Sequence, residues 1–136
     1  MNPHKNSMIQ IPKTDLLVHP LCLGANVFGW SADEKESNAV LDAYQSHGGN
    51  FIDTADVYSE WKDGNKGGDS EAIIGSWLKK RGNRSEVVIA TKGGITRGPG
   101  NDWFGTGGRS AEEHYLYRAV EASAGKLGVE KIQLCF

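Results

Sequence analysis

The chain has 136 residues, the size of one domain, and residues 1–136 are predicted to form a single domain. Hydrophobic residues make up 38% and charged residues 24% of the sequence, proportions that are ordinary for a globular protein and exclude a disordered chain. The formal net charge of −2 argues against nucleic acid as a partner, and no apolar run reaches the about 20 residues that a membrane span requires.

The N-terminal segment lacks the continuous apolar stretch of a secretory signal, so we expect a cytoplasmic protein. Two short apolar runs within Met8–Leu17 flank Pro12–Asp15 and predict a small hairpin before the main fold. Leu21–Leu23 then predicts a brief buried strand that stops at Gly24.

The two cysteines, Cys22 and Cys135, both lie in apolar, strand-like runs. We expect two buried thiols that act as small hydrophobic residues, rather than a disulfide or a reactive thiol. No group of cysteines and histidines has the spacing of zinc ligands, so the sequence predicts no metal site.

The first helix is predicted from a capping box, the arrangement in which a serine and a glutamate three positions later satisfy free backbone N–H groups. Ser31 and Glu34 have this spacing. Val40, Leu41 and Tyr44 follow at positions that share one helix face, which we expect to be buried. The glycine pair at 48–49 ends the helix, and a strand follows over residues 50–53.

The second helix follows a long polar loop, Thr54 to Gly68, of a length that is more often functional than idle. Asp69 and Ser70 are expected to cap this helix at its start. Its predicted buried face consists of Ile73, Ile74, Trp77 and Leu78. The continuous β-branched run at residues 87–91 then predicts a strand that is covered on both faces.

The third helix follows a second long loop, residues 93–108, that is rich in glycine. Residues 110–113 repeat the capping-box pattern, and Gly128 is expected to end the helix. Its predicted buried residues are Leu116, Ala119, Val120 and Leu127. Residues 132–136 then begin a fourth strand.

Alternating strands and helices predict right-handed βαβ units and a parallel sheet. A doubly wound sheet would need Gly-x-Gly-x-x-Gly after its first strand, and residues 24–29 do not supply it. The same segment has the glycine spacing of a phosphate loop, but Trp30 stands where lysine is required. Polar residues at successive strand ends favour the TIM barrel. We therefore predict an α/β fold of the parallel (β/α)8 type, with about the first four strands and three helices present after a short N-terminal hairpin.

Three residues at the predicted strand ends form a candidate proton-transfer site: Asp53, Tyr58 and Lys92. An ammonium group stabilises a phenolate, and a carboxylate holds the ammonium in place. Alternatives remain open, because Asp53 could be a turn residue that bonds its own backbone, and Tyr58 a half-buried loop anchor. Lys92 could be a surface cation or the amine of a Schiff-base lyase. The loop tryptophans Trp30, Trp61 and Trp103 could wall an apolar substrate pocket or pack on the scaffold.

Five motifs in sequence order resemble the aldo-keto reductase family. They are Leu23-Gly24 with Phe28-Gly29, the run from Gly49 to Tyr58, Ser70-Glu71-x-x-Ile74-Gly75, Val88 to Lys92, and Val120-Glu121-x-Ser123 with Leu127-Gly128. The resemblance covers residues 21–136, nearly the whole chain. It implies a (β/α)8 barrel that transfers a hydride between NADPH and the carbonyl of a small molecule.

In the family pattern, Tyr58 is the general acid, and Asp53 and Lys92 complete the catalytic set. Gly24, Ala25 and Asn26, together with Asp53, would lie near the nicotinamide of the cofactor. The family histidine would fall two positions beyond Phe136, and later strands would hold most of the cofactor phosphates. We therefore expect an incomplete barrel whose own activity is open.

Two other functions also stay open: a non-catalytic relative that acts as a binding or regulatory subunit, and a Schiff-base lyase that uses Lys92. An incomplete barrel would have open, apolar sheet edges, which favour self-association.

Overall fold

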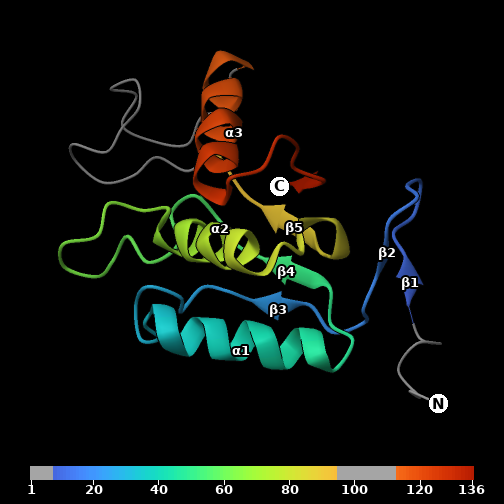
Figure 1. Ribbon diagram of the computed structural model, residues 1–136. Coiled ribbons are helices and arrows are strands. Elements are labelled where there is room, and N and C mark those ends of the chain that lie inside the picture. The colour runs from blue at the N-terminus through green and yellow to red at the C-terminus, as the bar shows by residue number, and fades with distance from the viewer. Residues whose placement is uncertain (1–7, 95–112) are drawn as a thin grey trace.

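The computed structural model describes residues 8–94 and 113–136, and within these ranges it has the predicted partial-barrel architecture (Figure 1). The strands β3 (Leu23–Gly24), β4 (Phe51–Asp53), β5 (Val88–Thr91) and β6 (Leu134–Cys135) form one parallel sheet in sequence order. The helices α1 (Glu34–Ser46), α2 (Asp69–Arg81) and α3 (Glu113–Leu127) connect them. A 3₁₀ turn, η2 (Arg84–Glu86), precedes β5.

The predicted N-terminal hairpin is confirmed. Its strands β1 (Ile9–Gln10) and β2 (Leu17–Val18) pair antiparallel and form a separate small sheet. The Asn50 side chain joins this hairpin to the main sheet, because its Nδ2 donates to Leu17 O at 2.9 Å and its Oδ1 accepts from His19 N at 2.8 Å. The hairpin is thereby tied to the residue directly before β4.

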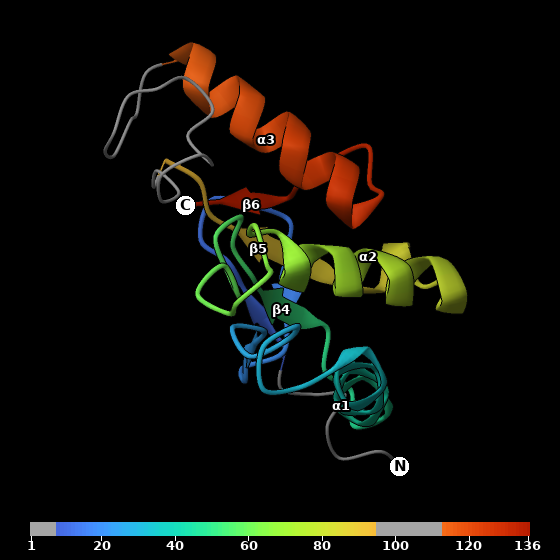
Figure 2. The same cartoon turned by 90° about the vertical axis from the view of Figure 1, so that its left-hand side faces the viewer.

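The three helices cover one face of the parallel sheet (Figure 2). Leu23, Ile52 and Ile89 lie side by side in the strand register and contribute to the core beneath these helices. Both Ile52 and Ile89 are fully buried, and the helices contribute Leu41, Ile74, Trp77, Leu78 and Leu127 to the same cluster. All four residues of β5 are buried, as the apolar run predicted.

Two of the expected helix starts are wrong. The capping box of α1 is formed by Asp33 and Glu36 instead of Ser31 and Glu34. The reason is a tight turn before the helix, in which Gly29 N donates to Ala32 O and keeps the chain non-helical up to that residue. The second helix begins after Gly68 in a left-handed conformation, and no side chain caps it, so neither Asp69 nor Ser70 has the expected capping role.

In α2 the predicted Ile74, Trp77 and Leu78 are buried, and Ile73 is partly buried against the core. The predictions for the other two helices are confirmed only in part. Leu41 is buried in α1, but Val40 is 43% exposed. In α3 the predicted burial of Ala119 and Leu127 is confirmed, but Leu116 and Val120 are exposed and Tyr115 and Ser123 are buried in their place. The buried face of α3 includes the polar residue Ser123, so the apolar pattern alone does not identify it. The capping box predicted at residues 110–113 falls largely outside the described residues.

The expected burial of the cysteines is also wrong, since both thiols are free and exposed. Cys22 lies directly before β3 and Cys135 lies in β6, the two outermost strands of the sheet, each of which is hydrogen-bonded on one side only. Partial burial still raises the pKa of both thiols, most strongly through desolvation. Within residues 8–94 and 113–136, no helix combines the length and the apolar character needed to cross a membrane.

Candidate active site

The candidate site lies at the carboxyl ends of β3, β4 and β5. In the sheet register Gly24 pairs with Asp53, and Asp53 pairs with Ala90, so the strands end at one common edge. Lys92 follows the last residue of β5, and its side chain reaches across to the end of β4. The parallel register therefore brings together residues that are 39 positions apart in the sequence.

Lys92 is the centre of the hydrogen-bond network at this edge. Its Nζ lies 2.7 Å from each carboxylate oxygen of Asp53 and donates to Thr54 O at 3.0 Å and to Tyr58 Oη at 3.0 Å. Nζ also lies 4.8 Å from the centre of the Tyr58 ring. The structure thus brings the three predicted residues, Asp53, Tyr58 and Lys92, into direct contact.

The charge of Lys92 follows from these contacts. Burial, the largest single influence, lowers the pKa of the ammonium group, but the hydrogen bonds and charges of Asp53 and Tyr58 together outweigh it. The pKa of Lys92 is therefore raised above its usual value, and the side chain is an ammonium group at neutral pH. With about a third of the Lys92 side chain and 28% of the Asp53 side chain exposed, the pair remains open to a ligand.

Tyr58 is held by the turn that follows β4. Its phenol oxygen lies 3.4 Å from Asp53 Oδ2. The next residue, Ser59, is fully buried and has a positive φ of 68°, a conformation that non-glycine residues rarely adopt. The Ser59 hydroxyl donates to Phe28 O at 2.6 Å, and this bond fixes the turn against the loop that follows β3. The turn thereby holds the Tyr58 phenol within hydrogen-bond distance of Lys92 Nζ.

The residues predicted to bind a cofactor, Gly24, Ala25 and Asn26, follow the same sheet edge. Ala25 N donates to Asp53 O at 2.8 Å, which places this segment directly beside the carboxylate residue. Gly24 and Asn26 are exposed, but Ala25 is fully buried, so its side chain cannot contact a ligand. Ala25 has 0% exposure as a whole residue, backbone included, so the exposed surface of this segment is formed by Gly24 and Asn26.

A model of the Aldo/keto reductase family matches residues 20–136, which include every strand and helix of the parallel sheet. The chain belongs to the aldo/keto reductase family. The structural prediction of a parallel, TIM-barrel-type fold is confirmed by the solved structures of other family members that it resembles.

Two relatives illustrate the range of this similarity. Norsolorinic acid reductase stcV of Emericella nidulans is 35% identical over 133 residues, which are 92% of this chain and 33% of that protein. An 11.2 kDa protein from the crtE 3′ region of Pseudescherichia vulneris is 51% identical over 82 residues, 60% of this chain and 80% of that protein.

Solved reductase structures share the fold. The aldo-keto reductase AKR11C1 of Bacillus halodurans, solved in its holo form, matches with a TM-score of 0.77 and 28% identity over 95% of this chain and 39% of that one. The glycerol dehydrogenase AKR11B4 of Gluconobacter oxydans matches with a TM-score of 0.73 and 28% identity, over 95% of this chain and 38% of that one. The chain thus spans a third of the norsolorinic acid reductase and less than half of either solved structure.

Two of the three loop tryptophans lie beside the candidate site. The Trp61 ring packs edge-on against the Tyr58 ring, with 6.3 Å between ring centres, and Trp30 packs against Trp61 at 5.5 Å. Both tryptophans are about half exposed, so they pack on each other and on the phenol but are not part of the core. Trp103 lies outside the described residues.

Four buried polar residues near the site were not predicted to take part in it: Thr54, Ser70, Glu71 and Thr91. The hydroxyl of Thr91 donates to Glu71 Oε1 at 2.6 Å, and those of Thr54 and Ser70 lie 2.9 Å apart. The motif Ser70-Glu71, which contributed to the family resemblance, was the signal that could have identified two of them.

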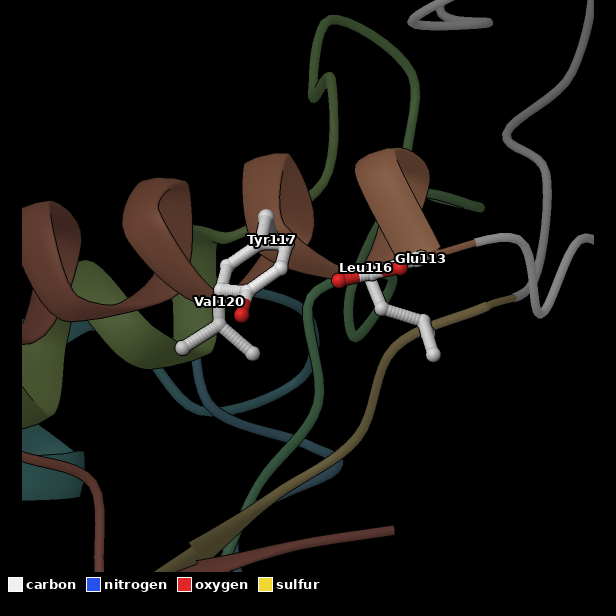
Figure 3. Close-up of a pocket in the computed structure, with 4 residues that line it drawn as sticks. All are labelled: Glu113, Leu116, Tyr117 and Val120. Carbon is white, nitrogen blue, oxygen red and sulfur yellow. The ribbon is translucent and has the colours of Figure 1, made fainter.

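One pocket lies away from this site. It is on the outer surface of α3, where Glu113, Leu116, Tyr117 and Val120 line it (Figure 3). Among the described residues that line it, none belongs to the candidate site. In the part of the chain that the structure describes, no cluster of three or more histidine, cysteine or acidic side chains is placed to hold a metal ion.

Proposed function

We propose that this site reduces the carbonyl group of a small aldehyde or ketone, with NADPH as the hydride donor. One observation carries the proposal: the Lys92 ammonium group lies 3.0 Å from the Tyr58 phenol oxygen and 2.7 Å from each carboxylate oxygen of Asp53. Family membership supports hydride-transfer chemistry at a site of this kind.

In the proposed reaction, Tyr58 donates its phenolic proton to the carbonyl oxygen of the substrate. The phenolate that remains lies within hydrogen-bond distance of the Lys92 ammonium group, which stabilises its negative charge. Asp53 keeps the ammonium in this position and balances its charge. Trp30 and Trp61, half exposed beside the phenol, form an apolar wall for the substrate.

Gly24 and Asn26 are the proposed contacts for the nicotinamide end of the cofactor, together with Asp53, and the buried Ala25 between them holds the segment in place through its backbone bond to Asp53 O. The segment fits this role, because Asn26 presents an exposed side-chain amide that can pair with a carboxamide, and Gly24 leaves open surface at the sheet edge. When bound, NADPH supplies the hydride that the carbonyl carbon receives.

The lyase alternative is less well supported. A Schiff base requires a neutral amine as nucleophile, and enzymes that use one lower the lysine pKa by desolvation or nearby cations. Lys92 has the opposite environment, with a carboxylate at 2.7 Å and a raised pKa. No comparable observation favours a purely regulatory role. The experiment below distinguishes that role from carbonyl reduction.

The test is the variant Tyr58→Phe, assayed by NADPH oxidation with a panel of aldehydes and ketones. We expect turnover to fall about 10²- to 10⁴-fold, the usual contribution of a general acid, while NADPH affinity stays unchanged. Tyr117→Phe is the matched control, because Tyr117 is 65% exposed on α3, far from the proposed acid. Unchanged turnover in Tyr58→Phe would refute the role of the phenol, and NADPH binding without turnover in the wild-type chain would favour the regulatory alternative.

A further inference from the structure

Ser70 joins two segments of the site through a chain of buried hydrogen bonds. Its Oγ donates to Ala25 O at 2.7 Å and lies 2.9 Å from the Thr54 hydroxyl. Ser70, Ala25 and Thr54 all have 0% exposure, so water does not compete for these bonds. One end of the chain is the segment proposed to bind the nicotinamide, and the other is the residue that follows Asp53.

The directions of these bonds follow from the chemistry of the groups. A serine hydroxyl has one proton, and Ala25 O can only accept, so the Ser70 proton points to Ala25. Thr54 must therefore donate to Ser70, because the only remaining capacity of the Ser70 hydroxyl is as an acceptor. The chain runs in one direction, from Thr54 to Ser70 to Ala25.

Thr54 also contacts the catalytic lysine through its backbone. Its carbonyl oxygen accepts from Lys92 Nζ at 3.0 Å, and its amide donates to Ala90 O at 2.8 Å. An ammonium group has three protons, and the acceptors around Lys92 are Asp53, Thr54 O and Tyr58 Oη. Asp53 and the Thr54 carbonyl therefore accept two of the three ammonium protons, and the third proton points to the phenol oxygen of Tyr58.

The position of Ser70 in α2 argues against a local role. It lies in the first turn of the helix, where a serine usually bonds free backbone N–H groups. Here Gly68 is the cap residue and no side chain satisfies the helix start. The hydroxyl is instead used across 45 positions of sequence, to Ala25.

We propose that Ser70 and Thr54 are positioning residues that orient the Lys92 ammonium group and couple it to the Gly24–Asn26 segment. This inference rests on the proposed reductase function. Ser70 holds the side chain of Thr54, and the Thr54 carbonyl holds Lys92 toward Tyr58. Ser70 also donates to Ala25 O, so a movement of the Gly24–Asn26 segment would be transmitted to Lys92 through the hydroxyl groups of Ser70 and Thr54.

The test measures the exchange of the Lys92 ammonium protons with water, by NMR of protein labelled with ¹⁵N-lysine, with Lys92→Arg used to identify the signal. Thr54→Val removes the donor at nearly constant volume, and Thr54→Ser keeps it. Ser70→Ala removes the central hydroxyl. Ser37→Ala is the matched control, because Ser37 is also fully buried in a helix and its hydroxyl donates to Ala32 O, in the loop before α1.

We expect exchange to be about five-fold faster in Thr54→Val and Ser70→Ala, the effect of losing one buried hydrogen bond, and unchanged in Thr54→Ser and Ser37→Ala. Equal exchange in Thr54→Val and Thr54→Ser would overturn the proposal. If Thr54→Val does not fold, the proton exchange rates of Ser70→Ala and Ser37→Ala are compared instead, and equal rates would overturn the proposal. If Thr54→Val and Ser70→Ala both fail to fold while Thr54→Ser folds normally, the proposal is also overturned, because the hydrogen bond then serves only the stability of the fold.

The exchange rate is read without cofactor or substrate, so it does not depend on reductase activity. A slow-exchanging lysine signal that responds to Thr54→Val, in a chain that reduces nothing, would support the positioning role and refute the proposed reaction. In an active chain, we expect the same variants to lower kcat more than they raise KM.

Discussion

Replacement of Asp53 by asparagine tests the ion pair at the centre of the site. The asparagine side chain has the same size and keeps one acceptor, but it lacks the charge that faces Lys92 at 2.7 Å. Exposed ion pairs contribute about 0–1 kcal/mol to stability, and hydrogen bonds to charged groups about 1.5–3 kcal/mol. Since the pair is roughly 30% exposed, we expect Asp53→Asn to lower the unfolding free energy by about 1–2 kcal/mol at neutral pH.

The pH dependence makes this prediction specific. The pKa of Lys92 is raised in the folded protein, so the stabilisation is complete below the ordinary lysine pKa of 10.5 and is lost as pH rises through the folded value. The variant lacks the carboxylate that raises this pKa. We therefore expect the stability curves of wild type and Asp53→Asn to begin to converge above about pH 10.5.

The assay is urea denaturation followed by tryptophan fluorescence, from neutral pH to about pH 11. Asp42→Asn is the control, because Asp42 forms an ion pair with Arg81, whose guanidinium does not titrate in this range. The loss of unfolding free energy caused by Asp42→Asn is therefore expected to stay constant with pH. A difference between wild type and Asp53→Asn that is as large at alkaline as at neutral pH would refute the assignment of the raised pKa to this pair.

Two further predictions concern the scaffold. A Cβ at Gly75 would lie 2.3 Å from Lys126 O, in the backbone of α3, so Gly75→Ala is expected to lower the unfolding free energy by about 1–3 kcal/mol in urea denaturation. A Cβ at Gly125 would have nothing within 4 Å, so Gly125→Ala is expected to be neutral or to stabilise the fold by up to about 1 kcal/mol. A smaller loss of stability at Gly75 than at Gly125 would contradict this packing. Within residues 8–94 and 113–136, β3 and β6 each pair with a single neighbouring strand, and Leu21 and Phe136 beside them are more than 60% exposed. We therefore expect concentration-dependent self-association in sedimentation velocity, and a stable monomer that binds no apolar dye would contradict it.

The order of elements was predictable from the sequence, because it depends on strong local patterns. The apolar run of β5 and the glycines after α1 and α3 mark their elements clearly, and all three predictions are confirmed. The contact of Asp53 with Lys92 also followed, since parallel strands that end together bring their terminal residues to one edge.

The remaining differences have causes that local patterns do not contain. The exposure of Cys22 and Cys135 depends on which strands are outermost, and that is a property of the sheet. In α3, Ala119 and Leu127 were predicted correctly, but Leu116 was chosen over Tyr115, because local hydrophobicity favours leucine and only the packing of the assembled fold decides which side chain is buried. Ser70 was misassigned because helix capping and long-range hydrogen bonding favour the same residue type.

The uncapped start of α2 has a consequence for how the protein opens. Helix initiation is costly, and Gly68 offers no side chain to lower that cost. Ser70 and Glu71, in the first turn, instead bond to residues that only the assembled strand ends bring near: Ala25, Thr54 and Thr91. The first turn of α2 and the lysine network therefore form one cooperative unit, and amide protons in both are expected to exchange through the same opening event.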